Sequence, residues 1–189
     1  MSFQKLMTWL LCDNVYDSLK EHEEEIFRLL PELKVCKGFD QKNKWHIYDV
    51  YEHILRVMSG VEASPVLRLT ALFHDLGKPP AFTQDEDGVG HFYGHWERSE
   101  ELFQKYEPLL NLPRDEAQLI RGLIFYHDVN VDLLTEEELE EMINRIGKQN
   151  LKLLFAVKRA DLMAQNPIFR DHLASIRNQE QRLLEVCLQ

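Results

Sequence analysis

Two adjacent histidine–aspartate pairs each follow an apolar segment of this chain. His74-Asp75 follows the run 69–73 and precedes Leu76-Gly-Lys, and His127-Asp128 follows the apolar segment 119–126. An ionisable group buried without a partner costs several kcal/mol of desolvation free energy, so chance explains neither pair well. Neutral imidazole and carboxylate groups are ligands for divalent ions such as Mn²⁺, Fe²⁺, Co²⁺, Ni²⁺ and Zn²⁺. The pairs therefore indicate a metal site that other side chains must complete.

Three more side chains of metal-ligating type lie in or at the ends of predicted helices. The complete set of candidate ligands is His53, His74, Asp75, His95, His127 and Asp161. Helices of a bundle can direct such side chains into one cavity. Asp49 lies one turn before His53 and is expected to orient its imidazole through the other ring nitrogen. The alternative interpretation is a helical bundle in which the histidines are structural and no metal binds.

Apolar residues at helical spacing account for nearly all of the chain. The predicted helices cover residues 2–30 (with a break near 13–14), 47–58, 64–76, 95–106, 116–127, 135–147, a buried segment 151–161, and 168–187. A loop is expected over 32–46, and the stretch 77–94 is expected to be irregular, with a short hairpin within 79–93. No segment shows sustained strand alternation. We therefore expect an all-α helical bundle that forms a single domain over residues 1–189.

Charge, cysteine and hydrophobicity patterns exclude several classes of protein. The formal net charge is -10 and the sequence pI is about 5.3, so no long nucleic acid is expected as a partner. The three cysteines are scattered without zinc-finger spacing, and an odd count without a secretory leader is typical of the reducing cytoplasm. No segment approaches the roughly 18 apolar residues that a membrane span requires. We expect a soluble, cytoplasmic protein.

The order of the candidate ligands resembles the HD-domain superfamily of metal-dependent phosphohydrolases. The matching elements are Asp49-Val-Tyr-Glu-His53, Phe73-His-Asp-Leu-Gly-Lys78 and Lys158-Arg-Ala-Asp-Leu162, which together give the pattern H…HD…D. The stretches His46-Ile-Tyr-Asp-Val-Tyr-Glu-His53 and Gly90-His-Phe-Tyr-Gly-His-Trp-Glu-Arg98 are similar to the HD domain of bacterial tRNA nucleotidyltransferases, the CCA-adding enzymes. The resemblance covers residues 45–165, with flanking N- and C-terminal helices. No Gly-Ser followed by a paired-aspartate nucleotidyltransferase signature occurs in the 189 residues, so we expect a stand-alone HD module.

The resemblance implies one or two divalent transition-metal ions, with Mn, Fe, Ni, Co or Zn as candidates and Mg as a further one. The implied ligands of one ion are His53, His74, Asp75 and Asp161. Members with two metals add histidines that match His95 and His127, and Asp75 then bridges the ions. Asp75 and Lys78 are the expected catalytic residues, and Lys78, His91 and Arg98 are expected to contact substrate phosphate. Their alternatives are surface charge for the two cations and packing on the loop for His91, whereas His46 is expected to be structural.

The implied activity is hydrolysis of a small phosphoester, a nucleotide rather than long RNA, by metal-activated water. Phosphomonoesterase, 2′-nucleotidase and 2′,3′-cyclic phosphodiesterase activities all fit the nucleotidyltransferase-like module. The six-ligand pattern also resembles HD hydrolases of dinucleoside tetraphosphates. A different class of function is a non-catalytic regulatory module, which holds metal and nucleotide without turnover. The residues leave the oligomeric state open.

Overall fold

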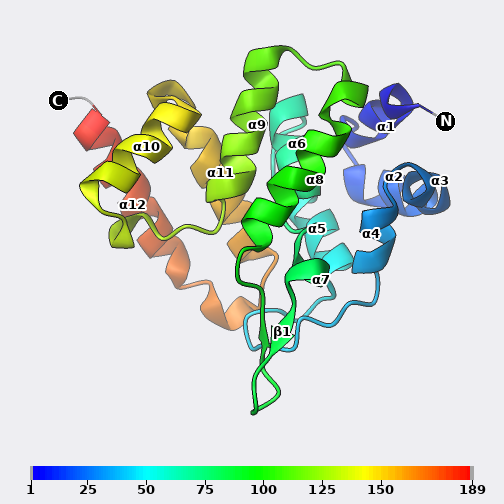
Figure 1. The fold of residues 1–189 in the computed structure, drawn as a ribbon, viewed down its shortest axis with the longest axis horizontal. Coiled ribbons are helices and arrows are strands. Elements are labelled where there is room, and N and C mark those ends of the chain that lie inside the picture. Colours follow the sequence, from blue (N-terminus) through cyan, green and yellow to red (C-terminus); the bar gives the residue numbers. More distant parts are fainter. Residues whose placement is uncertain (1, 188–189) are drawn as a thin grey trace.

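Helices make up most of the protein, as the sequence predicts. The computed structural model describes residues 2–187, drawn in Figure 1. Its helices are α1 (Phe3–Leu10), α2 (Val15–Glu21), α3 (Glu23–Leu29), α4 (Pro31–Cys36), α5 (Val50–Ser59), α6 (Pro65–Phe73), α7 (Lys78–Ala81), α8 (His95–Leu110), α9 (Arg114–Tyr126), α10 (Glu136–Ile146), α11 (Leu151–Met163) and α12 (His172–Cys187). Three 3-10 turns are η1 (Val131–Leu133), η2 (Lys148–Asn150) and η3 (Pro167–Phe169). The all-α prediction is confirmed for the described part of the chain.

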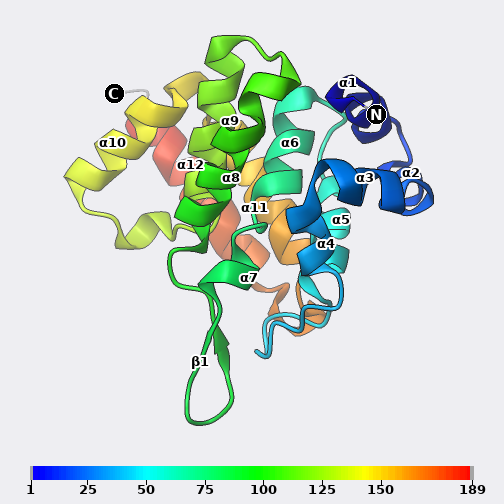
Figure 2. The same ribbon diagram turned by 45° about the vertical axis from the view of Figure 1, so that its right-hand side comes forward.

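Four short helices form the N-terminal part of the protein (Figure 2). The predicted helix 2–30 is divided into α1, α2 and α3, and Pro31 begins α4 at a position where its missing N–H costs little. The prediction of a loop from residue 32 is therefore wrong over residues 32–36. Leu33 and Cys36 lie three residues apart, so both point from α4 into the hydrophobic cluster that also contains α5 and α6.

The start of α5 is fixed by the side chain of Asp49. Its carboxylate accepts hydrogen bonds from the backbone N–H of Glu52 at 2.6 Å and from the backbone N–H of Gly38 at 2.7 Å. The first bond satisfies a donor that a helix start leaves free, and the second ties the preceding loop to α5. The expectation that Asp49 orients His53 is therefore wrong, because this carboxylate caps the helix instead.

Helices α9 and α11 are packed on two sides. Ile120 of α9 and Val157 of α11 lie in one hydrophobic cluster with α1, α4, α5 and α6. Leu123 of α9 and Phe155 of α11 lie in a second cluster with α10 and α12. Both helices are thereby held between two cores, which fixes the direction of their remaining side chains. Within residues 2–187, every helix is too short or too polar to cross a membrane.

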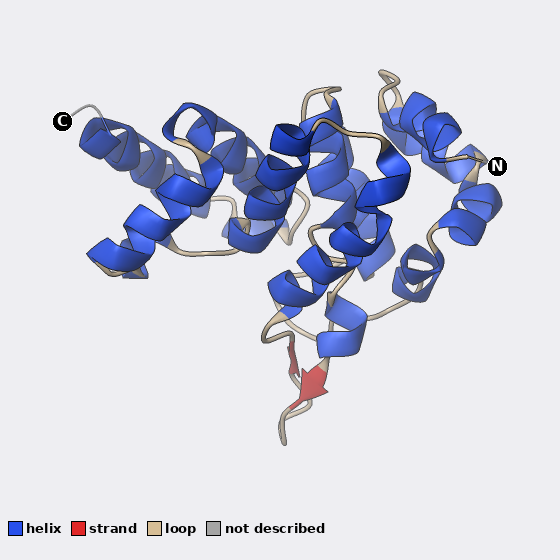
Figure 3. Ribbon diagram, turned by 45° about the horizontal axis from the view of Figure 1, so that its top comes forward, coloured by secondary structure: helices blue, strands red, loops and turns tan. Residues whose placement is uncertain are grey.

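A two-stranded hairpin projects from the helical body between α7 and α8, as Figure 3 shows. Strands β1 (Thr83–Gln84) and β2 (Gly90–His91) pair antiparallel, and Thr83 lies opposite His91. This confirms the hairpin predicted within 79–93. The backbone N–H of Gly90 donates to the carbonyl of Lys42 at 2.8 Å. The base of the hairpin is therefore tied to the loop that precedes α5.

Candidate metal centre

Five helices bring the six candidate ligands together. His53 lies in α5, His74 and Asp75 follow α6, His95 begins α8, His127 follows α9, and Asp161 lies in α11. The four histidines and Asp75 are at most 3% exposed, and the Asp161 side chain retains 13% exposure. Residues that are more than 100 positions apart in the sequence thus meet in the interior, where charged groups need partners.

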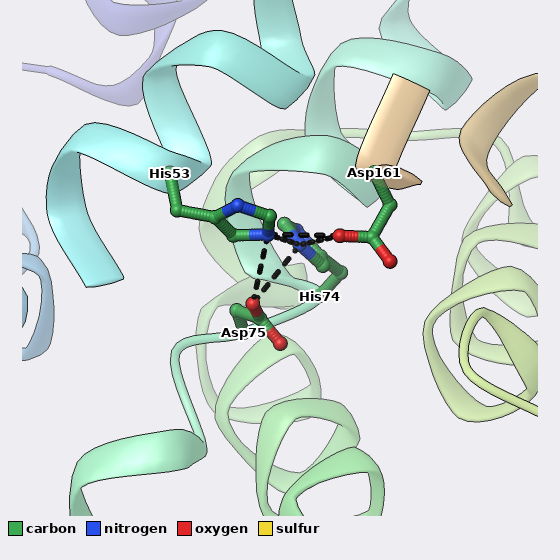
Figure 4. Close-up of side chains that lie close together, drawn as sticks. All are labelled: His53, His74, Asp75 and Asp161. Atoms are coloured by element: carbon green, nitrogen blue, oxygen red, sulfur yellow. Dashed lines mark hydrogen bonds and ion pairs between the residues drawn. The ribbon is translucent and has the colours of Figure 1, made fainter. Parts of the chain in front are cut away.

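The first group of side chains surrounds one carboxylate oxygen of Asp75. Its Oδ2 atom lies 3.2 Å from His53 Nε2 and 3.3 Å from His74 Nε2. Asp161 closes the group from α11, with its Oδ1 atom 2.8 Å from His53 Nε2 (Figure 4). One ligand atom from each of these four residues lies within 4.8 Å of the others. This arrangement can hold a cation.

The second group surrounds the other oxygen of the same carboxylate. Asp75 Oδ1 lies 3.4 Å from His95 Nε2 and 3.6 Å from His127 Nε2. The two imidazole nitrogens are 3.3 Å apart. These three ligand atoms again lie within 4.8 Å of one another. Asp75 therefore belongs to both groups, with a different oxygen in each.

Backbone carbonyls fix which ring nitrogen of three histidines carries hydrogen. The Nδ1 atom of His74 lies 2.8 Å from Ala71 O, and that of His127 lies 2.7 Å from Ile124 O. His95 makes the corresponding contact with the preceding loop. A neutral imidazole that donates from Nδ1 has its lone pair on Nε2. In these rings Nε2 is therefore an acceptor directed at Asp75.

The donor set fits divalent cations. Both carboxylate oxygens of Asp75 are fully buried, and the Lys78 ammonium lies 2.7 Å from one of them, Oδ2. Each oxygen also faces two imidazole nitrogens, and acceptors that face each other at 3.2–3.6 Å repel unless a positive charge lies between them. Imidazole and carboxylate ligands suit the divalent transition metals. One ion in each group would satisfy the buried acceptors.

The electrostatics keep the carboxylates ionised. Burial alone would raise the pKa of Asp75, but its electrostatic interactions with His74 and with the Lys78 ammonium hold it well below its ordinary value. For Asp161, burial is outweighed by His53, so its pKa is also lowered. For His53, burial would lower the pKa, but its hydrogen bonds to both carboxylates raise it to about 9. Without metal, a proton therefore occupies the first group.

Lys78 is a buried cation beside Asp75. Its Nζ atom lies 2.7 Å from Asp75 Oδ2, 2.8 Å from Gln41 Oε1 and 3.2 Å from His46 Nε2. Burial and the neighbouring Lys78 ammonium lower the pKa of His46 to about 2, so this ring stays neutral and accepts from the lysine. An ammonium has three hydrogens to donate, and three partners surround this one. This arrangement favours a role for Lys78 in holding Asp75. It does not favour the phosphate contact that the sequence suggests for this lysine.

The other two predicted phosphate contacts lie apart from the two ligand groups. His91 is in β2, where its Nε2 atom lies 2.8 Å from Asp85 Oδ2 and its ring stacks on Tyr93. Arg98 forms an ion pair with Glu101 at 3.0 Å, and its side chain is 60% exposed. Arg98 borders a separate cavity of about 720 Å³. The structure does not bring Arg98 to the metal centre, and we no longer propose a phosphate contact for it.

Two cavities open beside the centre. One of about 390 Å³ is bordered by His127 and Asp161. The other, of about 750 Å³, is bordered by Lys78 and His95, and the hairpin residue His91 also lines it. Each cavity is therefore bordered by ligand residues, and Trp45 and Asp128 line both cavities.

Sequence comparison agrees with this arrangement. A family model described as "HD domain" matches residues 46–165, which span all six candidate ligands. The chain belongs to the HD domain family. The HD region is 32% identical over 108 residues to an A-adding tRNA nucleotidyltransferase of Deinococcus radiodurans, which covers 54% of this chain and 25% of that protein. It is 34% identical over 114 residues to a CC-adding tRNA nucleotidyltransferase of Thermus thermophilus, which covers 57% of this chain and 25% of that protein. The resemblance inferred from the sequence is confirmed, and the aligned HD region spans about a quarter of these relatives.

Two supporting side chains of the HD centre are not evident from residue types alone. Lys158 donates from Nζ to the carbonyls of His127 at 2.9 Å and Val129 at 2.7 Å. It thereby holds the segment that follows α9. Gln41 reaches Lys78 from a loop 37 residues earlier. The role of Lys158 could be inferred from the sequence, because a cation within the apolar run of α11 needs buried acceptors. Nothing in the sequence around Gln41 indicates its role.

Proposed function

We propose that this chain is a metal-dependent phosphohydrolase that acts on a small phosphoester, and that the phosphoester is a nucleotide. The observation that carries the proposal is the position of the Asp75 carboxylate. One of its oxygens faces His53 and His74, and the other faces His95 and His127. Two ions held by one carboxylate form the kind of pair that phosphoester hydrolysis uses.

In this proposal, each ligand group holds one divalent ion, with Mn, Fe, Ni, Co, Zn or Mg as candidates. The ions, when bound, lower the pKa of water toward neutrality and offset negative charge on phosphoryl oxygens. Asp75 is shared by both groups and stays ionised because the buried Lys78 ammonium lies 2.7 Å from it. Hydrogen bonds to carbonyls keep His74 and His127 oriented with Nε2 toward Asp75. Hydrogen bonds of this kind orient metal-ligating imidazoles before the metal binds.

Two observations favour a nucleotide as the substrate. The relatives named above are tRNA nucleotidyltransferases, which supports a nucleotide-like substrate. The net charge of -10 disfavours a long nucleic acid held through many phosphates. A phosphomonoester or a 2′,3′-cyclic phosphodiester of a nucleotide fits both considerations. We propose a cytoplasmic location for this activity, as the cysteine content suggests.

A second candidate is hydrolysis of a dinucleoside polyphosphate. It is favoured by the presence of two cavities, of about 390 Å³ and about 750 Å³, that are each bordered by ligand residues. A substrate with a nucleoside on each side of the cleaved phosphate would fill both. A non-catalytic regulatory module is the remaining alternative, and it predicts metal and nucleotide binding without turnover.

The test is a screen of phosphoesters with the purified protein. Nucleoside 5′- and 2′-monophosphates, 2′,3′-cyclic nucleotides and diadenosine tetraphosphate are incubated with Mn²⁺, Ni²⁺, Co²⁺, Zn²⁺ or Mg²⁺, and release of product is measured by chromatography. We expect metal-dependent turnover of at least one class, abolished by chelator. Metal and nucleotide binding without turnover of any of them would favour the regulatory module instead.

A further inference from the structure

The smaller cavity beside the metal centre is built partly by α12. Figure 1 shows α12 running beside α11 toward the C-terminal end of the chain. His127 and Asp161 border the cavity on the metal side, and His172, Ser175 and Gln179 of α12 border it on the other. Helix α12 lies outside residues 46–165, which match the HD domain family. Whatever this wall recognises is therefore a property of this chain and is not assigned by the family match.

An aromatic side chain stands at the edge of this cavity in a fixed position. The indole of Trp45 packs on the ring of Phe169, with centroids 3.9 Å apart. The backbone around it is tied to the start of η3, because Asn166 donates from its N–H to Trp45 O at 2.8 Å and from Nδ2 to Lys44 O at 3.0 Å. Trp45 nevertheless remains 36% exposed. It offers a rigid aromatic surface next to the ligand groups.

A buried amide provides hydrogen-bonding groups at another part of the cavity lining. Gln179 is only 6% exposed, and its Nε2 atom donates to Asn130 Oδ1 at 3.0 Å and to Ser175 Oγ at 3.4 Å. Among the described residues, Gln179 Oε1 and Asn130 Nδ2 make no hydrogen bond of their own, and Asn130 is exposed. Both residues line the cavity. An acceptor and a donor are therefore available side by side to a ligand in the cavity.

The size of the cavity suits a small planar ring. Its volume of about 390 Å³ lies within the range of about 300–1,000 Å³ that is typical of small-molecule sites. Bases stack on aromatic side chains, and their edges carry both donors and acceptors. A phosphate group would not need these features, since neither an indole ring nor a neutral amide pair neutralises its charge.

We propose that this cavity binds the purine or pyrimidine base of the substrate, stacked on Trp45 with its edge at Gln179 and Asn130. The phosphoester of the same molecule then lies at the two ligand groups. This inference rests on the proposed function, because it names the part of the substrate that the hydrolytic centre does not contact. It makes α12 and the loop before α5 the elements that select a nucleotide over other phosphoesters.

The experiment compares ligands that differ only in the base. The ligands are the non-hydrolysable 5′-methylenephosphonate analogues of the four common nucleoside monophosphates and of ribose 5-phosphate. Binding to the full chain with Mn²⁺ is measured by isothermal titration calorimetry. At least one nucleotide analogue should bind about tenfold or more tightly than the ribose analogue, as expected for one stacked base. Equal affinity for all five ligands would overturn the proposal.

Variants then locate the base. Trp45→Ala and Gln179→Ala should each remove most of the affinity difference between the nucleotide analogue and the ribose analogue. Neither variant should change the affinity for the ribose analogue. Trp45→Phe should retain part of it, because an aromatic ring remains. Gln181→Ala is the matched control, since Gln181 lies on the same helix, is exposed and bonds only to Glu185 among the described residues. An advantage that persists in both Trp45→Ala and Gln179→Ala would place the base elsewhere.

Failure of the proposed function gives a different result. If no phosphonate binds in a metal-dependent way, the centre does not hold a 5′-phosphoester, and the base site is tested with adenosine, guanosine, cytidine and uridine. At least one nucleoside should still bind, more weakly in Trp45→Ala than in the natural chain. Absence of binding by all four nucleosides would overturn the base site as well.

Discussion

The Nζ atom of Lys78 lies 2.7 Å from Oδ2 of Asp75, and both side chains are almost completely buried. Lys78 also contacts Gln41 and His46, which come from the loop before α5. The lysine therefore links that loop to the carboxylate shared by both ligand groups. It supplies positive charge to Asp75 whether or not metal is bound.

Replacing Lys78 by methionine should destabilise the metal-free protein more than the metal-loaded protein. Without metal, the change leaves the buried Asp75 carboxylate with much less compensating charge, and breaking a buried pair costs about 3–5 kcal/mol. Bound Mn²⁺ would supply charge to the same carboxylate, so the loss of unfolding free energy should be smaller. Urea unfolding with chelator and with Mn²⁺ measures both values. Lys105→Met, which removes an exposed ion pair with Glu32, should change the unfolding free energy equally with chelator and with Mn²⁺. An equal loss of unfolding free energy in the two conditions for Lys78→Met would contradict the role of Lys78 as the charge partner of Asp75.

Asp75→Ala should abolish turnover and leave the helical fold. Both ligand groups lose their shared carboxylate, whereas the hydrophobic clusters on either side of α9 and α11 are untouched. Turnover is measured with whichever phosphoester the screen identifies, and the fold by circular dichroism. Asp87→Ala, at the exposed tip of the hairpin, is the control and should keep full activity. Near-normal rates in Asp75→Ala would rule out the assigned role.

Metal uptake should release protons near pH 7. The pKa of His53 is raised from its ordinary 6.5 to about 9 in the metal-free protein, and a metal ligand must be neutral, so binding displaces about one proton. Affinity should therefore rise with pH and level off above about 9. The same shift stabilises the metal-free fold fully below pH 6.5, and this contribution is lost as pH rises through about 9. Calorimetry in buffers of different ionisation enthalpy counts the protons, and His53→Gln should release about one fewer. No difference between the two proteins would contradict the assignment.

Gly77→Ala should weaken metal binding at the second ligand group. A Cβ atom on Gly77 would lie 2.3 Å from His95 O and 2.6 Å from Ser99 N, so α8 and the imidazole it carries must shift. Overpacking of this kind costs about 1–3 kcal/mol. Gly122→Ala in α9 is the matched control, because its nearest neighbour lies at 3.4 Å and alanine favours a helix by about 1 kcal/mol. Thermal unfolding and Mn²⁺ titration compare the stability and the metal affinity of the two variants. Equal Mn²⁺ affinities of Gly77→Ala and Gly122→Ala would contradict this prediction.

The six clustered residues could be chosen from the sequence because each has a ligand side chain in or beside an apolar helix. His74 and His127 are clear examples, since both end such a segment. The partners of Lys78 could not be chosen in this way. Gln41 and His46 lie more than 30 residues earlier, and no periodic pattern relates them to α7.

The roles of other side chains depend on which of two local interactions forms, or on packing between elements that are distant in the sequence. Asp49 has the spacing to orient His53, but a carboxylate before a helix can also cap it, and that bond forms instead. Arg98 follows His95 within the same helix, yet its guanidinium pairs with Glu101 at the surface. The cavity wall formed by Gln179 requires α12 to fold back along α11, which no local signal near residue 179 specifies.

The number of metal ions bound by the natural chain and by His127→Ala tests the central claim most directly. His127 belongs only to the second ligand group, so its removal should lower the Mn²⁺ stoichiometry from about two to about one per chain. Equilibrium dialysis with elemental analysis gives both numbers. His22→Ala, a histidine on the N-terminal helices that stacks on Trp9, should still bind about two. A natural chain that binds no Mn²⁺, or a His127→Ala chain that still binds two, would contradict a centre in which Asp75 joins two ions.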